Sequence, residues 1–163
     1  MPLTYEPIST TTLGSASTIT FSSIPSTYTD LRIVLVGLVT NADAGIMRFN
    51  SDTASNYSFT QVRSDGTTAS SSRSSNQTNI YIGEYTSTAI PSLTTIDIFS
   101  YAGSTFKASL ITNNADKNGS GNIFNFVALY RSTTAISSIT LSCVNYTNFA
   151  VGTTATLYGI KAA

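Results

Sequence analysis

The feature that most constrains this sequence is an apolar run at residues 31–39, which reads LRIVLVGLV. The run has the length and the β-branched content of a strand, and it is too short to cross a membrane as a helix. Alternate residues of a strand point to opposite faces, so Ile33 and Leu35 share one face while Val34 and Val36 share the other. Because both faces are apolar, we expect this strand to lie at the centre of the fold and to be covered on both sides.

The remaining apolar runs are short, alternate with polar residues and are separated by turn signals at close intervals. The clearest hairpin joins residues 93–101 to residues 105–112, and residues 123–131 form a second strongly apolar strand. About ten such strands, with no capped amphipathic helix between them, are typical of a sandwich or barrel. The sequence therefore predicts an all-β fold: an antiparallel, jelly-roll-like β-sandwich with no substantial helix.

The length of the chain predicts a single domain that spans residues 1–163. Residues 1–13 are rich in Thr and contain Pro7, which cannot donate a hydrogen bond to a neighbouring strand. We therefore expect this segment to be an extended N-terminal arm or an edge strand.

Residues 63–79 contain no apolar residue beyond Ala69, which predicts a long loop of a kind that is often functional. Arg63 and Arg73 flank a hydroxyl-rich stretch of this segment, and Asn76 follows them. Because Arg side chains bind carboxylates through paired hydrogen bonds, these three residues form a candidate intersubunit contact loop. A solvated loop with two solubilising charges is an equally good interpretation.

Charge and composition exclude some classes of partner. Eight basic and eight acidic residues leave a net charge of zero, which argues against a nucleic-acid-binding protein with its clustered basic surface. Charged residues are only 10% of the chain, whereas Ser and Thr make up roughly a third of it, far above average usage. Short hydroxyl side chains lose little entropy when they pack against a partner, although the same composition is typical of extracellular β-proteins.

The residues needed for catalysis are scarce. The chain has no His, which removes the commonest general base and zinc ligand, and we expect its single cysteine, Cys143, to be a buried and inert thiol. Most acidic residues fall in turns, and only Glu84 and Asp97 lie in predicted strands. We therefore expect no enzyme, no catalytic residue, no cofactor and no metal.

No segment of the sequence predicts export or a membrane partner. The first residues have neither the basic region nor the apolar region of a signal peptide, and no stretch is long and apolar enough to span a bilayer. We expect a protein that is made in a cytoplasm and is not exported by a signal peptide.

Several short strings, taken in order, resemble a family of small tailed-bacteriophage proteins that is frequent in phages of aquatic bacteria and cyanobacteria. The strings cover nearly the whole chain: FSSIP at residues 21–25 with YTDL at 28–31, RFNSD at 48–52 with SNYS at 55–58, SRSSNQ at 72–77, ALYRST at 128–133 with ITL at 139–141, and LYGIKA at 157–162. Members of the family look like virion structural proteins, standing alone or as modules of tail or fibre proteins.

The resemblance implies a virion structural protein, and two roles compete. One is a capsid decoration (cement) protein that binds and stabilises the assembled lattice of major capsid protein; the other is a tail-fibre tip or receptor-binding knob. We favour decoration because the chain has no coiled-coil or repetitive shaft. Both roles are usually filled by homotrimers, so we expect self-association, with the major capsid protein or other virion proteins as partners. A carbohydrate-binding module, with a host surface glycan as its partner, is a further alternative.

Overall fold

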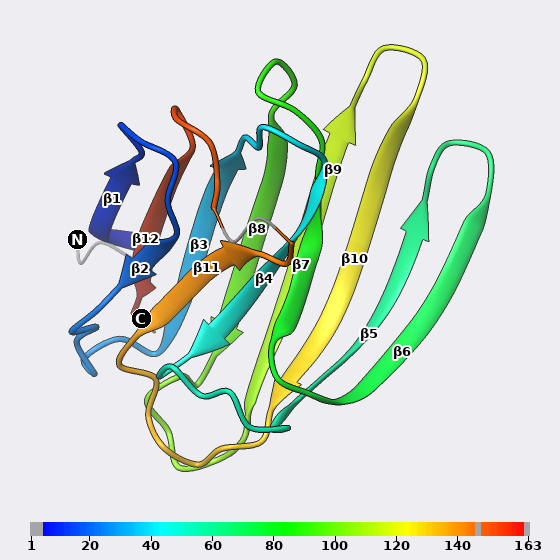
Figure 1. Cartoon of the computed structure of the whole chain (residues 1–163). Helices are drawn as coiled ribbons and strands as arrows, with labels where there is room; N and C mark the ends of the chain where they lie inside the picture. Colours follow the sequence, from blue (N-terminus) through cyan, green and yellow to red (C-terminus); the bar gives the residue numbers. More distant parts are fainter. Residues whose placement is uncertain (1–4, 146–147, 162–163) are drawn as a thin grey trace.

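The computed structural model describes residues 5–145 and 148–161 and has an all-β architecture in two layers (Figure 1). Twelve strands, rather than the ten or so predicted, form two antiparallel sheets. The large sheet has eight strands in the order β1-β12-β3-β8-β9-β10-β5-β6, and the small sheet has four in the order β2-β11-β4-β7. Within the described residues, no helix has the length and apolar character that crossing a membrane requires.

The strands are bounded by short turns rich in Ser, Thr, Asn, Asp and Gly, as expected from the turn preferences of these residues. In chain order they are β1 (Tyr5–Thr12), β2 (Ile19–Phe21), β3 (Asp30–Gly37), β4 (Asp43–Phe49), β5 (Tyr57–Ser64), β6 (Ala69–Gln77), β7 (Ile80–Tyr85), β8 (Ser92–Phe99), β9 (Lys107–Asp116), β10 (Gly121–Tyr130), β11 (Ile139–Cys143) and β12 (Thr154–Ile160).

The antiparallel β-sandwich predicted from the sequence is confirmed. Early strands pair with late ones in a nested order: β1 with β12, β2 with β11, β4 with β7 and β5 with β6. Nested pairing spread over two packed sheets resembles the connectivity of a jelly roll.

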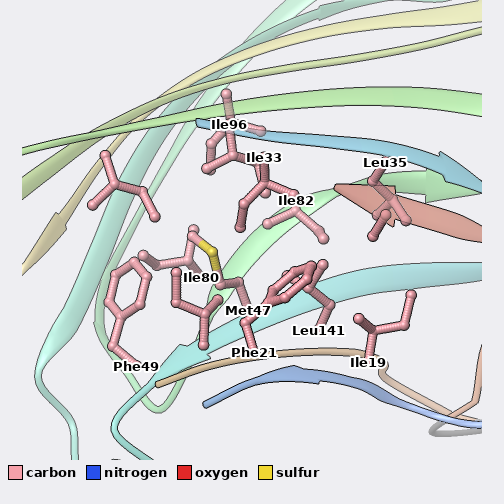
Figure 2. Close-up of a cluster of buried hydrophobic side chains, with 14 of the residues drawn as sticks. Ile19, Phe21, Ile33, Leu35, Met47, Phe49, Ile80, Ile82, Ile96 and Leu141 are labelled. Atoms are coloured by element: carbon pink, nitrogen blue, oxygen red, sulfur yellow. The ribbon is translucent and has the colours of Figure 1, made fainter. Parts of the chain in front are cut away.

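The core lies between the two sheets (Figure 2). Ile33 and Leu35 reach it from the large sheet, whereas Met47, Phe49 and Ile82 reach it from the small sheet, and all five are fully buried. The period-two pattern of β3 and β4 produces this layer, because it places every second side chain on the inner face of its sheet.

The expectation that the run at residues 31–39 is covered on both sides is wrong. Leu31, Ile33 and Leu35 are fully buried, but Val34, on the opposite face of β3, is 40% exposed. The reason is that the small sheet covers only one face of the large sheet, and no described segment covers the other face.

Strand β9 directs three polar side chains inwards, although its outward face includes an apolar residue. Lys107, Ser109 and Asn113 are fully buried, whereas Leu110 is 50% exposed. The Nζ of Lys107 donates to backbone carbonyl oxygens of three residues: Gly103 at 2.7 Å, Ser132 at 3.4 Å and Thr105. Burial lowers the pKa of this amine, while the surrounding carbonyls supply acceptors that replace water.

Asn113 links the two sheets through hydrogen bonds. Its Oδ1 accepts from the backbone N–H of Glu84 in β7 at 3.0 Å, and its Nδ2 donates to the Oγ1 of Thr94 in β8 at 2.9 Å. The hydroxyls of Thr94 and Tyr85 are 2.6 Å apart, so the chain of contacts returns to β7. A Cβ at Gly83, which has a φ of +119°, would lie 2.1 Å from the Cγ of Asn113, so only glycine fits beside this amide.

Another close approach fixes the ring of Tyr85, which is fully buried. A Cβ at Gly37 would lie 2.3 Å from the Cε1 of Tyr85, and one at Gly45 would lie 2.4 Å from its Cε2. The ring therefore lies between the backbones of β3 and β4, one from each sheet, in space that a side chain at either glycine would fill.

The uncovered side of the large sheet, called here the open face, carries most of the exposed apolar side chains. Eight of the eleven large hydrophobic residues exposed in the described part of the chain lie on it, each between about 39% and 56% exposed. Exposed apolar groups gathered on one face are characteristic of an interaction surface. The eight are Tyr5, Val34, Val62, Leu93, Phe99, Leu110, Ile123 and Val127.

The two edges of the large sheet differ in their side chains. Strand β1 is one edge, which agrees with the edge-strand alternative for residues 1–13; residues 1–4 lie outside the described residues. The pairing of β1 with β12 shifts in register between Pro7 and Ser9. Glu6 in this strand accepts hydrogen bonds from Lys161 at 2.9 Å and Tyr28 at 3.0 Å. Strand β6, the opposite edge, contains no proline, and its register shift is confined to the end near Gln77, between the partners of Tyr57 and Phe59.

Candidate functional site

The acidic residues in turns accept hydrogen bonds from their own turns. Asp52 accepts from the backbone N–H of Ala54 at 2.7 Å, the side-chain amide of Asn56 at 2.8 Å and the hydroxyl of Tyr130 at 3.0 Å. Asp65 accepts from the N–H and the hydroxyl of Thr67, and these bonds together with that from the N–H of Thr68 lower its pKa to about 2. A carboxyl with so low a pKa stays ionised and cannot donate a proton at neutral pH.

The prediction that most acidic residues fall in turns is wrong, because the structure also places Glu6, Asp30, Asp43 and Asp116 within or at the ends of strands. Glu84 and Asp97, the two acids predicted to lie in strands, are on different sheets and are both paired. Asp97 accepts two hydrogen bonds from the guanidinium of Arg32, at 2.5 and 2.8 Å, on the open face. Glu84 accepts from Asn122 at 2.9 Å and lies 3.6 Å from the guanidinium of Arg63. They therefore do not face each other as a catalytic pair would. Within the described ranges, no three His, Cys, Asp or Glu side chains are grouped closely enough to hold a metal ion.

The structure corrects the loop predicted at residues 63–79. The segment forms the end of β5, a turn at residues 65–68 and strand β6. Strands β5 and β6, called here the ribbon, are the last two strands of the large sheet, and β5 pairs with β10 over its whole length. Figure 1 shows the ribbon at the far side of β10, beyond β7, the last strand of the small sheet. Neither face of β6 is covered, so most of its residues are exposed on both faces and no apolar periodicity marks the strand.

The base of the ribbon is fixed by aromatic packing. Tyr57 is fully buried, and its ring stacks on that of Tyr130 with 4.8 Å between centroids. Phe59 stacks on Tyr81, with centroids 6.2 Å apart, and makes an edge contact with Phe126. The ribbon is therefore anchored at the Tyr57 end of β5, and its side chains become more polar towards the turn at residues 65–68.

The three predicted contact residues lie in the ribbon but are not brought together. Arg63 points towards the small sheet, where it pairs with Glu84 and donates to the hydroxyl of Ser70 at 3.2 Å. Asn76 has a φ of 55°, and its Oδ1 accepts a hydrogen bond from Arg131 at 2.8 Å, so its side chain has a local structural role.

Arg73 is the predicted contact residue that is best placed to meet a partner. It lies opposite Thr60 on the open face, and its Nε donates to the Thr60 hydroxyl at 3.2 Å. The ion pairs of the described residues join Arg32 to Asp97, Arg63 to Glu84 and Lys161 to Glu6, so they do not include Arg73. Beside it lies a hollow of about 330 Å³, whose lining includes Ala108, Val127 and Leu129.

The ribbon also has an open backbone edge. Strand β6 is last in the order of the large sheet and has no strand neighbour on its outer side among the described residues. An uncovered edge of this kind can pair with an extended strand from another chain. Six of its nine residues are Ser or Ala, and Arg73 is its single charged residue, so little on the strand opposes such an approach.

A larger hollow, of about 510 Å³, lies between the β5–β6 turn and the β9–β10 turn. Asp65, Asn114, Asp116 and Asn122 contribute polar groups to it, and Ile123 contributes an apolar surface. The sequence predicted a long loop where the β5–β6 turn lies and did not indicate this hollow, because the pairing of β5 with β10 is a contact between distant parts of the chain.

Comparison of this chain with protein-family models, with curated proteins and with solved structures finds no match in any of the three. The geometry of the ribbon and the open face, together with the sequence resemblance, is therefore the basis for a functional proposal.

Proposed function

We propose that this protein is a bacteriophage virion structural protein, and specifically a capsid decoration protein that binds the assembled major capsid lattice through the β5–β6 ribbon. The virion setting comes from the sequence resemblance. The observation that carries the docking role is the ribbon itself, which has an aromatic base and ends the large sheet in an exposed, almost uncharged strand.

Two physical properties suit the ribbon to permanent docking. Its Ser side chains have few rotamers to lose, so packing against a partner costs less conformational entropy than burying Lys or Glu would. Its outer edge can add main-chain hydrogen bonds to a partner strand, and Arg73 can pair with a partner carboxylate. Binding would then be specific without a deep pocket.

The number of copies in purified virions tests this role. A decoration protein that occupies the lattice should be present in hundreds of copies per particle, measured by a stained gel against the major capsid protein. A fibre tip should be present in only a handful of copies. Absence from purified particles would exclude both virion roles.

The variant Arg73→Ala tests the ribbon. We expect it to reduce binding to particles about tenfold or more, because a charge-assisted pair contributes roughly 1.5–3 kcal/mol, with little change in thermal stability. Arg63→Ala is the matched control, since Arg63 is already paired with Glu84 inside the protein and should affect particle binding less. A large drop in melting temperature with unchanged particle binding would contradict the proposed role of Arg73.

The hollow between the two turns favours a second candidate function, a receptor-binding knob or carbohydrate-binding module. Its volume of about 510 Å³ and its Asn and Asp side chains suit a saccharide, whose hydroxyl groups need such hydrogen-bonding partners. Saturable binding to a glycan array, abolished by Asn114→Ala, would support this alternative, particularly if the protein binds host cells and is rare in virions.

A further inference from the structure

We propose that the open face of the large sheet is a self-association surface, on which a second copy of this chain packs sheet against sheet as a two-fold dimer. This inference does not depend on the proposed virion role. It rests on the open face, whereas the docking role rests on the outer backbone edge of β6 and on Arg73, which lies at the margin of that face.

The first observation is where the apolar side chains lie. Leu110 and Val127 are directly opposite each other on β9 and β10, near the middle of the sheet, and are 50% and 51% exposed. Leu93 and Ile123 lie on the same face and are 53% and 55% exposed. Between them lie short polar residues such as Thr112, so the surface lacks the long flexible side chains that are depleted from interface cores.

The second observation is the size of the surface. Neighbouring strands are about 4.8 Å apart and each residue rises about 3.3 Å, so eight strands of this length present a face of about 800–1,000 Å². A standard stable interface buries about 800 Å² on each partner. The open face therefore has the area that one dimer contact needs.

The third observation is charge and shape. The four central strands of this face are β3, β8, β9 and β10, and away from the strand ends their charged residues are Arg32 and Asp97. These two side chains form an ion pair within one chain, so their charges cancel. Two copies can then approach without opposing like charges. Both copies carry the same right-handed twist, which lets their sheets pack face to face at about −30°, as the sheets of sandwiches do.

A second copy fits these observations better than the trimer implied by the sequence resemblance. A single flat face that contacts its own copy produces a closed two-fold pair, whereas a ring of three requires two different surfaces on each chain. The mass of the free protein in solution therefore discriminates between the two.

The test is the mass of the purified full-length protein, measured by sedimentation and light scattering over a wide range of concentrations. We expect a particle of twice the chain mass of 17.2 kDa. Val127→Lys should weaken self-association at least tenfold, because it places an unpaired charge at the centre of the contact. Val151→Lys is the matched control: Val151 is 56% exposed but lies in a turn outside the open face, so this variant should remain dimeric.

Circular dichroism establishes whether each variant is folded, and Leu110→Lys replaces Val127→Lys if the latter does not fold. A monomer at every concentration would overturn the proposal. A trimer, or a dimer that Val127→Lys and Val151→Lys weaken equally, would overturn it as well. None of these outcomes bears on the number of copies in virions, so the two proposals can fail separately.

Discussion

Replacing Asn113 with Ala should destabilise the protein more than any comparable change to an exposed asparagine. The side-chain amide of Asn113 joins the two sheets, because it accepts a hydrogen bond from the N–H of Glu84 in β7 and donates one to Thr94 in β8. Asn113→Ala removes both hydrogen bonds and leaves a small cavity between the sheets.

The magnitude follows from these contacts. Each lost hydrogen bond contributes about 1 kcal/mol net, and the N–H of Glu84, left without its acceptor, adds about 1–2 kcal/mol. Thr94 keeps Tyr85 as a partner, so its hydroxyl adds little to the cost. The expected loss is about 3 kcal/mol of unfolding free energy, which for a domain of this size lowers the melting temperature by about 6–12 °C.

The assay is reversible urea or thermal unfolding followed by circular dichroism, with Asn125→Ala as the control. Asn125 is also a strand asparagine, but it is exposed, so its replacement should change the stability by no more than about 0.5 kcal/mol. Tyr85→Phe tests the other end of the same chain of contacts, and its effect should not add simply to that of Asn113→Ala, because both changes act through Thr94. Equal stability of Asn113→Ala and Asn125→Ala would refute the argument that the amide holds the sheets together.

Three further predictions concern packing and ionisation. Gly37→Ala should destabilise the protein by about 1–3 kcal/mol, because the added methyl group would overlap the ring of Tyr85. Gly14→Ala is the control, since the space around Gly14 is open, and it should not destabilise the protein. Equal melting temperatures of the two variants would contradict this. Burial raises the pKa of the Tyr57 and Tyr85 phenols above the value of about 10 that they have in the unfolded chain. Their contribution to the unfolding free energy is therefore complete below about pH 10 and is lost as the pH rises towards their folded-state pKa values. An unfolding free energy that does not fall above about pH 10 would contradict this. Burial also raises the pKa of the Cys143 thiol to about 12, so a thiol reagent should label the native protein only after denaturation, and rapid labelling at neutral pH would show that the site opens.

Apolar alternation was sufficient to predict the fold class and most strands. It places the β8–β9 hairpin and strand β10 correctly, because each of these strands has a buried face with residues at every second position. It fails for β6, which has no buried face and therefore no alternation. The Asp65–Gly66 pair that begins the turn could have indicated a hairpin there, since this pair is typical of tight turns between strands.

The direction in which each strand faces was harder to predict than its position. On β3 and β9 some outward side chains, such as Val34 and Leu110, are apolar, and on β9 some inward ones, such as Lys107, are polar, so hydrophobicity alone does not distinguish the core from the open face. Asn113 lies two residues from the buried Ile111 and so on the same face of β9, which indicates that its side chain is buried. Its hydrogen-bond partners, on β7 and β8, become known only from the tertiary structure. The roles of Arg63, Arg73 and Asn76 likewise depended on which face of the ribbon each one occupies.

The unequal edges of the large sheet limit how copies of this protein could join side by side. A filament that grows by adding molecules side by side needs two unpaired strand edges on every molecule, one for each neighbour. Here Pro7, which has no N–H to donate, interrupts the β1 edge, whereas residues 69–74 of β6 pair in regular register with β5 and leave an outer edge that can accept a strand. Lateral growth would therefore stop after one addition, and a surface rich in β-edges remains compatible with a soluble, finite assembly.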